Sequence, residues 1–142
     1  MPLSLALAGL AGLVAVAVIA GLIWRALDGR RRRTHDASVS PEELGSHAGR
    51  TVLLQFTTET CARCPQVRRM LRAVSDALTG VEFAEVDLTR RPDLAAKHRI
   101  LATPTTFVIS PDGAVAARFG GVPRRMDIEA ALASLRSPQE IR

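Results

Sequence analysis

The two cysteines of this chain, Cys61 and Cys64, are separated by two residues and follow a short apolar run. This spacing at the junction of a strand and a helix suits dithiol/disulfide exchange, because the orphan N–H groups and partial positive charge of a helix N-terminus stabilise a nearby thiolate. Cys61 is then the candidate nucleophile. Cys64, one helical turn later, can attack a mixed disulfide at Cys61 and release the reduced partner. The pattern therefore predicts a redox-active pair in which Cys64 is the resolving thiol.

The elements that position this pair follow from the hydrophobic pattern. Residues 51–57 are β-branched and apolar, which predicts a strand buried on both faces. Apolar residues at helical spacing predict the helix that carries the cysteines at 62–78. Further patterns predict strands at 81–88, 105–110 and 114–119, and helices at 41–47, 92–98 and 127–135. This alternation implies a mixed sheet with helices on both faces.

An uncharged apolar run of 22 residues extends from Leu3 to Trp24. As a helix it reaches about 33 Å, enough to cross a bilayer core of roughly 30 Å. The run predicts a transmembrane anchor at residues 1–24 that contacts the lipid bilayer through residues 3–24. A cleaved signal peptide is the alternative, although no basic residue precedes the run and no convincing cleavage site ends it.

The excess of positive charge lies beside this apolar run. Arg25 and Arg30 to Arg33 are five of the 19 basic residues, whereas from Thr34 onward 14 Lys and Arg stand against 13 Asp and Glu. We expect a basic juxtamembrane linker at 25–39 and a nearly neutral domain at 40–142, with no nucleic-acid-binding face. Because the polar segment from Thr34 to Val39 is short, the domain should lie close to the membrane.

The arginines also predict the topology of the chain. The positive-inside rule places them, and the domain after them, in the cytoplasm of a single-pass protein of the cell membrane. An extracytoplasmic domain is the alternative. We interpret Arg30 to Arg33 as a stop-transfer signal, although such a cluster also suits anionic lipid headgroups.

With the elements placed, residues from about 40 to 136 resemble a thioredoxin-fold domain. The resemblance is carried by the strand at 52–56 running into Cys61-x-x-Cys64, by Thr103-Pro104 before the strand at 105–109, and by the turn at 111–113, Gly120-Gly121 and the terminal helix. It implies an α/β three-layer sandwich. The first strand should be short or absent, since few residues precede the helix at 41–47.

The family also implies roles for individual residues. The proline that matches Pro104 has a cis peptide bond there and lies against the cysteines, while the residue that matches Thr103 offers its backbone to an extended substrate segment. On this resemblance Cys61 and Cys64 are catalytic. The substrate-binding residues are Thr60, Ala62, Arg63, Thr103 and Pro104.

The sequence departs from the family pattern around the cysteines. Thioredoxins usually have Trp before the first cysteine and Gly-Pro between the two, where this chain has Thr60 and Ala62-Arg63. The family's buried acid matches Gln55, which cannot take up a proton. Glu85 and Glu59 are candidates to replace it, although each is more simply interpreted as an ordinary strand or loop carboxylate.

Charged and metal-binding residue types near the pair give further expectations. Arg63 would stabilise a Cys61 thiolate and make the pair more oxidising, or it is simply a solvated arginine with a screened effect. His35, His47 and His98 are not spaced with the cysteines as a metal set, and we expect them on the surface. No cofactor and no metal is expected.

These observations favour a membrane-tethered thiol:disulfide oxidoreductase. It would be a monomer that exchanges the Cys61-Cys64 dithiol or disulfide with protein substrates and with an upstream redox partner protein. Two alternatives stay open: a soft-metal module that binds Cu or Zn through both thiolates, and a thioredoxin-fold binding module without turnover.

Overall fold

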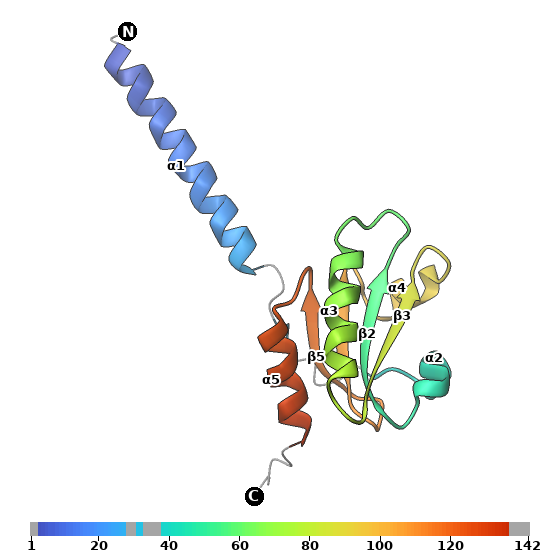
Figure 1. Ribbon diagram of the computed structural model, residues 1–142. Helices are drawn as coiled ribbons and strands as arrows, with labels where there is room; N and C mark the ends of the chain where they lie inside the picture. Colours follow the sequence, from blue (N-terminus) through green and yellow to red (C-terminus); the bar gives the residue numbers. More distant parts are fainter. Residues whose placement is uncertain (1–2, 28–30, 33–37, 137–142) are drawn as a thin grey trace, which may run out of the picture.

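A long helix, α1 (Leu3–Leu27), precedes an α/β domain in the computed structural model, which describes residues 3–27, 31–32 and 38–136 (Figure 1). The predictions for Arg30, Arg33, Thr34 and His35 fall outside these residues. The remaining elements are β1 (Arg31–Arg32), α2 (Pro41–Leu44), the 3-10 helix η1 (Gly45–His47), β2 (Thr51–Thr57), α3 (Cys64–Asp76), β3 (Val81–Asp87), α4 (Pro92–Lys97), β4 (Thr105–Ile109), β5 (Val115–Gly120) and α5 (Arg125–Arg136).

The strands form one mixed sheet in the order β1-β5-β4-β2-β3. The central strand β2 runs parallel to β3 and antiparallel to β4, and β4 is antiparallel to β5. In this register Phe56 near the end of β2 pairs with Thr105 at the start of β4, and Thr105 pairs with Gly120 at the end of β5. One end of the sheet therefore gathers segments that are distant in the sequence.

The first strand is short, as predicted. Among the described residues, β1 consists of Arg31 and Arg32, which pair with Phe119 and Arg118 of β5, and an isolated bridge joins Ser38 to Ala114. Arg31, Arg32 and Ser38 lie within the segment 25–39, for which a juxtamembrane linker is predicted. The chain that follows α1 is thus joined to an edge of the sheet.

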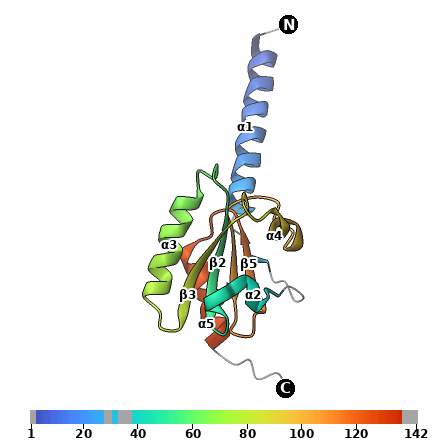
Figure 2. The same ribbon diagram turned by 90° about the vertical axis from the view of Figure 1, so that its right-hand side faces the viewer.

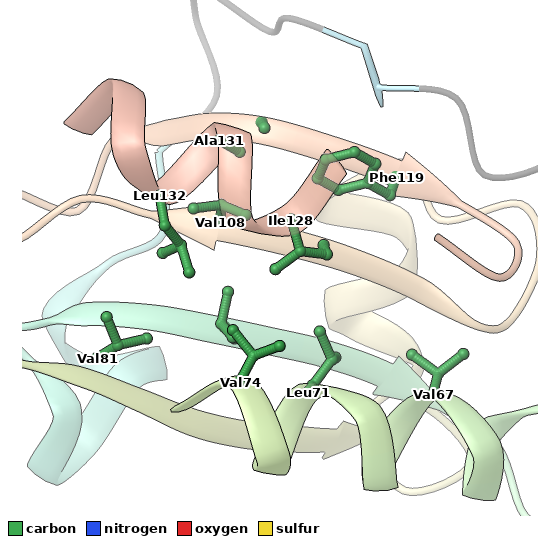
Figure 3. Close-up of a cluster of buried hydrophobic side chains, with 11 residues drawn as sticks. Val67, Leu71, Val74, Val81, Val108, Phe119, Ile128, Ala131 and Leu132 are labelled. Carbon is green, nitrogen blue, oxygen red and sulfur yellow. The ribbon is translucent and has the colours of Figure 1, made fainter. Parts of the chain in front are cut away.

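Helices cover both faces of the sheet, so that β2 is buried on each side (Figure 2). On one face α3 and α5 pack against the strands through the apolar cluster of Figure 3, made of Leu53, Val67, Leu71, Val74, Val81, Val108, Ala117, Phe119, Ile128, Ala131 and Leu132. On the other face α2 and α4 contribute to a second cluster of Val39, Leu44, Val52, Leu54, Phe56, Leu88, Leu94, Phe107, Ile109 and Val115. Full burial of one such aliphatic or aromatic side chain contributes about 1.5 to 3 kcal/mol. The three-layer α/β fold is confirmed.

Helix α3 is shorter than the helix expected at 62–78. Residues 61–63 form a turn in which the N–H of Cys64 donates to the Cys61 carbonyl, 3.3 Å away, and the helix starts only at Cys64. At the other end the chain turns at Gly80, whose φ of +80° suits glycine. At the C-terminal end the apolar spacing continues past the helix because Leu78 in the turn still packs against the core, whereas Ala62 and Arg63 before the helix are exposed.

His98 is buried, and the expectation that it lies on the surface is wrong. Its ring lies 5.8 Å from the rings of both Phe56 and Phe107, and its Nε2 is 3.0 Å from a carboxylate oxygen of Glu43. These contacts join α4 to α2 and to the sheet, and no local pattern reveals them. His47 is partly exposed and bonded to Glu82 on β3, while His35 lies outside the described residues.

The Glu43 carboxylate is the centre of a polar cluster on this face. It accepts hydrogen bonds from the Ser40 N–H at 2.7 Å and the Ser40 hydroxyl at 2.8 Å, and Lys97 Nζ lies 3.0 Å away. Burial by itself would raise the pKa of Glu43, whose side chain is 9% exposed, but these hydrogen bonds and the one with His98 outweigh burial and lower the pKa to about 2. The charged form of Glu43 therefore stabilises the fold.

The cluster predicts how stability depends on pH. As the pH falls from 4.5 towards 2, the unfolded Glu43 carboxyl takes up a proton before the folded one does. The free energy of unfolding should therefore decrease by up to about 3 kcal/mol over this range, and the contribution should be fully present above it. In Glu43→Gln, which keeps the side-chain shape, the decrease should be smaller. Urea unfolding of the full chain in detergent micelles measures both; equal pH slopes would contradict the prediction.

Candidate active site

Cys61 and Cys64 form a disulfide at the start of α3, with their Cα atoms 5.5 Å apart. The pair is asymmetric, because Cys61 is partly exposed and Cys64 is buried with 1% of its surface accessible. A partner can reach the first cysteine from solvent, whereas the second is covered. This asymmetry is the one that an attacking and a resolving thiol require.

A tight turn at the end of β2 positions the disulfide. The Cys61 N–H donates to the Thr58 carbonyl at 3.2 Å, and Cys64 becomes the first residue of α3. Pro65 follows at no cost in hydrogen bonds, because the N–H groups of the first helical turn lack helical partners. The N-terminus of α3 therefore faces the pair, where its partial positive charge favours a thiolate.

Gln55 connects the centre of the sheet to the resolving cysteine. Its side chain is fully buried, and its Nε2 donates to the Cys64 carbonyl at 3.0 Å. Among the residues that the structure describes, its Oε1 has no hydrogen-bond partner, and neither has Oγ1 of Thr106, the residue that pairs with Gln55 on β4. An uncharged amide thus occupies the position that the resemblance matches to the family's buried acid.

A cleft of about 320 Å³ opens beside the disulfide. Its lining residues come from the ends of β2 and β3, the turn and the first part of α3, and are Thr57, Thr58, Glu59, Cys61, Cys64, Pro65, Arg68, Glu85 and Asp87. Both carboxylates that the sequence singled out, Glu59 and Glu85, therefore lie in one cleft with the cysteines. Glu85 accepts a hydrogen bond from Arg68 Nε at 2.7 Å, and this contact raises the pKa of the Arg68 guanidinium.

The loop before β4 reaches the turn that holds the cysteines. The peptide bond between Thr103 and Pro104 is cis, as the resemblance implies. The Thr103 hydroxyl lies 3.2 Å from that of Thr58, and the Pro104 carbonyl accepts the Gly121 N–H at 2.8 Å.

The proposed substrate-binding residues are not all equally accessible. Thr60, Ala62 and Arg63 are exposed near Cys61, Thr103 is partly buried and Pro104 is buried. The structure thus brings Thr103 to the edge of the cysteine turn and leaves Pro104 covered.

Sequence reasoning missed Thr58, Arg68 and Asp87 as residues of the site. Arg68 follows Cys64 by four residues and so lies on the same side of α3. Asp87 pairs with Thr57 across the parallel strands, so this signal depends on a register that the sequence alone does not give.

The orphaned Thr106 hydroxyl predicts an unusual stability effect. Because a buried hydroxyl without a partner costs about 1 to 3 kcal/mol, Thr106→Val should raise the free energy of unfolding by roughly 1 kcal/mol. The matched control is Thr105→Val on the same strand, which removes a hydrogen bond of 2.7 Å to the Ala102 carbonyl and should lower stability. Denaturant unfolding of the two variants should give opposite signs; a destabilised Thr106→Val variant would refute this account.

Comparison with known proteins places this site in a family. The thioredoxin family model matches residues 36–134. Rabbit (Oryctolagus cuniculus) thioredoxin is 27% identical over 90 residues, which cover 63% of this chain and 85% of the rabbit protein. Thioredoxin H5 of Oryza sativa subsp. japonica is 28% identical over 80 residues, covering 56% of this chain and 58% of the rice protein. The chain thus spans less than two thirds of this rice relative.

The fold comparison agrees with the sequence comparison. The X-ray structure of Fasciola hepatica thioredoxin superposes with a TM-score of 0.56 at 26% identity, covering 66% of this chain and 88% of that one. The family match excludes α1 and includes both cysteines, Gln55 and the cis-proline loop. Because the thioredoxin family model matches more than half of the residues of this chain, the chain belongs to the thioredoxin family.

Proposed function

We propose that this protein is a membrane-tethered thiol:disulfide oxidoreductase in which Cys61 attacks and Cys64 resolves. The observation that carries the proposal is a disulfide at the N-terminus of α3 between one partly exposed and one buried cysteine. Membership of the thioredoxin family supports the same reaction. The substrates are protein disulfides or dithiols, and a second redox protein returns the pair to its starting state.

The exchange needs no group beyond the two sulfurs. In the reducing direction the Cys61 thiolate attacks one sulfur of the partner's disulfide, and the other partner sulfur leaves as a thiolate. Cys64 then attacks the Cys61 sulfur, which forms the intramolecular disulfide and releases the partner's second thiol. Two electrons pass to the partner, and an upstream dithiol restores the reduced pair by the same steps in reverse.

The surroundings of the pair suggest how a substrate is held and where protons go. An extended substrate segment would lie against the backbone of Thr103, next to Pro104, with Thr60, Ala62 and Arg63 around the accessible sulfur. Gln55 cannot accept the Cys64 proton. The cleft that Cys64 lines instead offers the carboxylates Glu59 and Glu85.

Helix α1 supports the tether. Leu7–Trp24 is long and apolar enough to cross a membrane, and none of this stretch is buried inside the structure. A secretory signal sequence has the same features. We favour a single-pass monomer with its domain in the cytoplasm, because the arginines follow the apolar run.

A trapping experiment tests the exchange. Cys64→Ser should accumulate mixed disulfides through Cys61 that reductant dissolves, because the resolving step is lost while the attacking sulfur remains accessible. Cys61→Ser is the matched control and should trap nothing. Mass spectrometry after alkylation, with and without reductant, identifies the linked cysteines. An untrapped Cys64→Ser variant would refute the exchange, and Cu or Zn bound to two protected thiols would favour the metal-binding alternative.

Thiol labelling in intact cells tests the topology. With the domain in the cytoplasm, a membrane-impermeant maleimide should modify Cys61 only after the cells are permeabilised. The Cys61→Ser variant controls for labelling elsewhere. In that background Ser4→Cys, which lies before the candidate span Leu7–Trp24, should be labelled from outside. Labelling of Cys61 in intact cells would reverse the orientation.

A further inference from the structure

Helix α1 is attached to the end of the sheet that carries the disulfide. Strand β1 follows α1, and its first residue, Arg31, pairs with Phe119. Phe119 precedes Gly120, which lies in one row with Thr105 and Phe56 near the end of β2. In both views α1 rises from the end of the domain where β2 ends and α3 begins (Figures 1 and 2).

The segment between α1 and β1 is too short for the C-terminal end of α1 to lie far from the disulfide end of the sheet. Three residues separate Leu27 from Arg31, so the four steps along the chain between them span at most about 14 Å. Three strand spacings, about 14 Å, separate β1 from β2. Along the strands, the seven residues of β2 separate the two ends of the sheet by roughly 23 Å. Of the two ends of the sheet, the one with the disulfide is therefore next to α1.

Positive charge gathers at the same place. We define the active-site end as the loops 58–63, 88–91, 98–104 and 121–124, which adjoin that end of the sheet. Its charged side chains are Arg63, Arg90, Arg91, Arg99 and Arg124 against Glu59. The loops at the opposite end, 45–50, 77–80 and 110–114, contain one arginine and one aspartate. A nearly neutral domain thus has a basic end.

At this end an exposed apolar side chain lies close in the sequence to each of two arginines, in loop 98–104 and in the first turn of α5 next to loop 121–124. Arg90 and Arg91 have acidic neighbours in Asp87 and Asp93, whereas loops 98–104 and 121–124 contain Arg99 and Arg124 and no carboxylate.

The apolar side chains stand close to these arginines in the sequence. Leu101 is 95% exposed and Met126, two residues after Arg124, is 67% exposed. Among the described residues outside α1, these are the two large hydrophobic side chains that are exposed. Arginine beside an exposed apolar group is the combination that binds the interface of an anionic bilayer.

We propose that the active-site end docks on the anionic surface of the membrane that holds α1. Arg99 and Arg124 contact lipid phosphates there, while Leu101 and Met126 enter the boundary between headgroups and acyl chains. This inference rests on the proposed tether. Its consequence is that Cys61 works at the bilayer surface, so that a partner must present its disulfide or thiols there.

Fluorescence quenching by lipids tests the docking. The full chain is placed in vesicles of phosphatidylcholine and phosphatidylglycerol with brominated acyl chains, and Trp24, its single tryptophan, is replaced by Trp24→Phe. In this background Leu101→Trp reports on the active-site end, and Thr79→Trp, at an exposed turn of the opposite end, is the matched control. Quenching of Leu101→Trp should be at least about twofold stronger than that of Thr79→Trp.

The remaining outcomes separate the docking from the tether. Adding Arg99→Glu and Arg124→Glu, or omitting phosphatidylglycerol, should weaken the quenching at position 101 towards that of the control. Washing the vesicles with alkaline carbonate tests the tether, because a membrane-spanning chain stays in them. Equal quenching of Leu101→Trp and Thr79→Trp in a chain that resists this wash overturns the docking alone. Release by carbonate overturns the tether as well.

Discussion

The register of β2 is the constraint on which the rest of the structure depends. Side chains alternate between the faces of a sheet, so a slip of one residue would move Gln55 to the face opposite α3. Both faces of β2 are covered by apolar clusters, so burial of its aliphatic residues alone distinguishes poorly between the two registers. The hydrogen bond from Gln55 to the Cys64 carbonyl exists in one of them only. A polar residue in an apolar strand thus supplies specificity that the hydrophobic pattern lacks.

The same residue shows what this site costs in stability. Gln55 Oε1 and Thr106 Oγ1 are buried on paired residues of adjacent strands without hydrogen-bond partners, at about 1 to 3 kcal/mol each. The aromatic contact between Phe56 and Phe107 on the other face, with ring centroids 4.9 Å apart, contributes about 0.5 to 1.5 kcal/mol beyond its burial. The face with the disulfide therefore has an energetic cost that packing on both sides of the sheet offsets.

Much of this arrangement could be predicted from the sequence, and the failures have a common cause. The strand at 51–57 and the cysteine pair were predictable because continuous apolar runs and a two-residue spacing are local signals. The burial of His98 is not predictable because its partner Glu43 is 55 residues away, and the C-terminal end of α3 is not predictable because Leu78 in the following turn still packs against the core. Glu85 was considered as a carboxylate near the site, but its pairing with Arg68 depends on the alignment of β3 with β2. The pattern within each helix or strand is thus clear from the sequence, whereas the contacts between these elements cannot be predicted from it.

The connection between the two loops of the site explains how a single accessible sulfur can be selective. The hydroxyl contact between Thr58 and Thr103 joins the cysteine turn to a loop 45 residues further along the chain. The sulfur and the proposed substrate-binding backbone are consequently held as one unit, which reduces the conformational entropy lost when an extended segment binds. Because α1 is attached through β5 to the same end of the sheet, a tether would also restrict the orientation of this unit. For a partner in the same membrane, the effective concentration at Cys61 would then depend on geometry as well as on affinity.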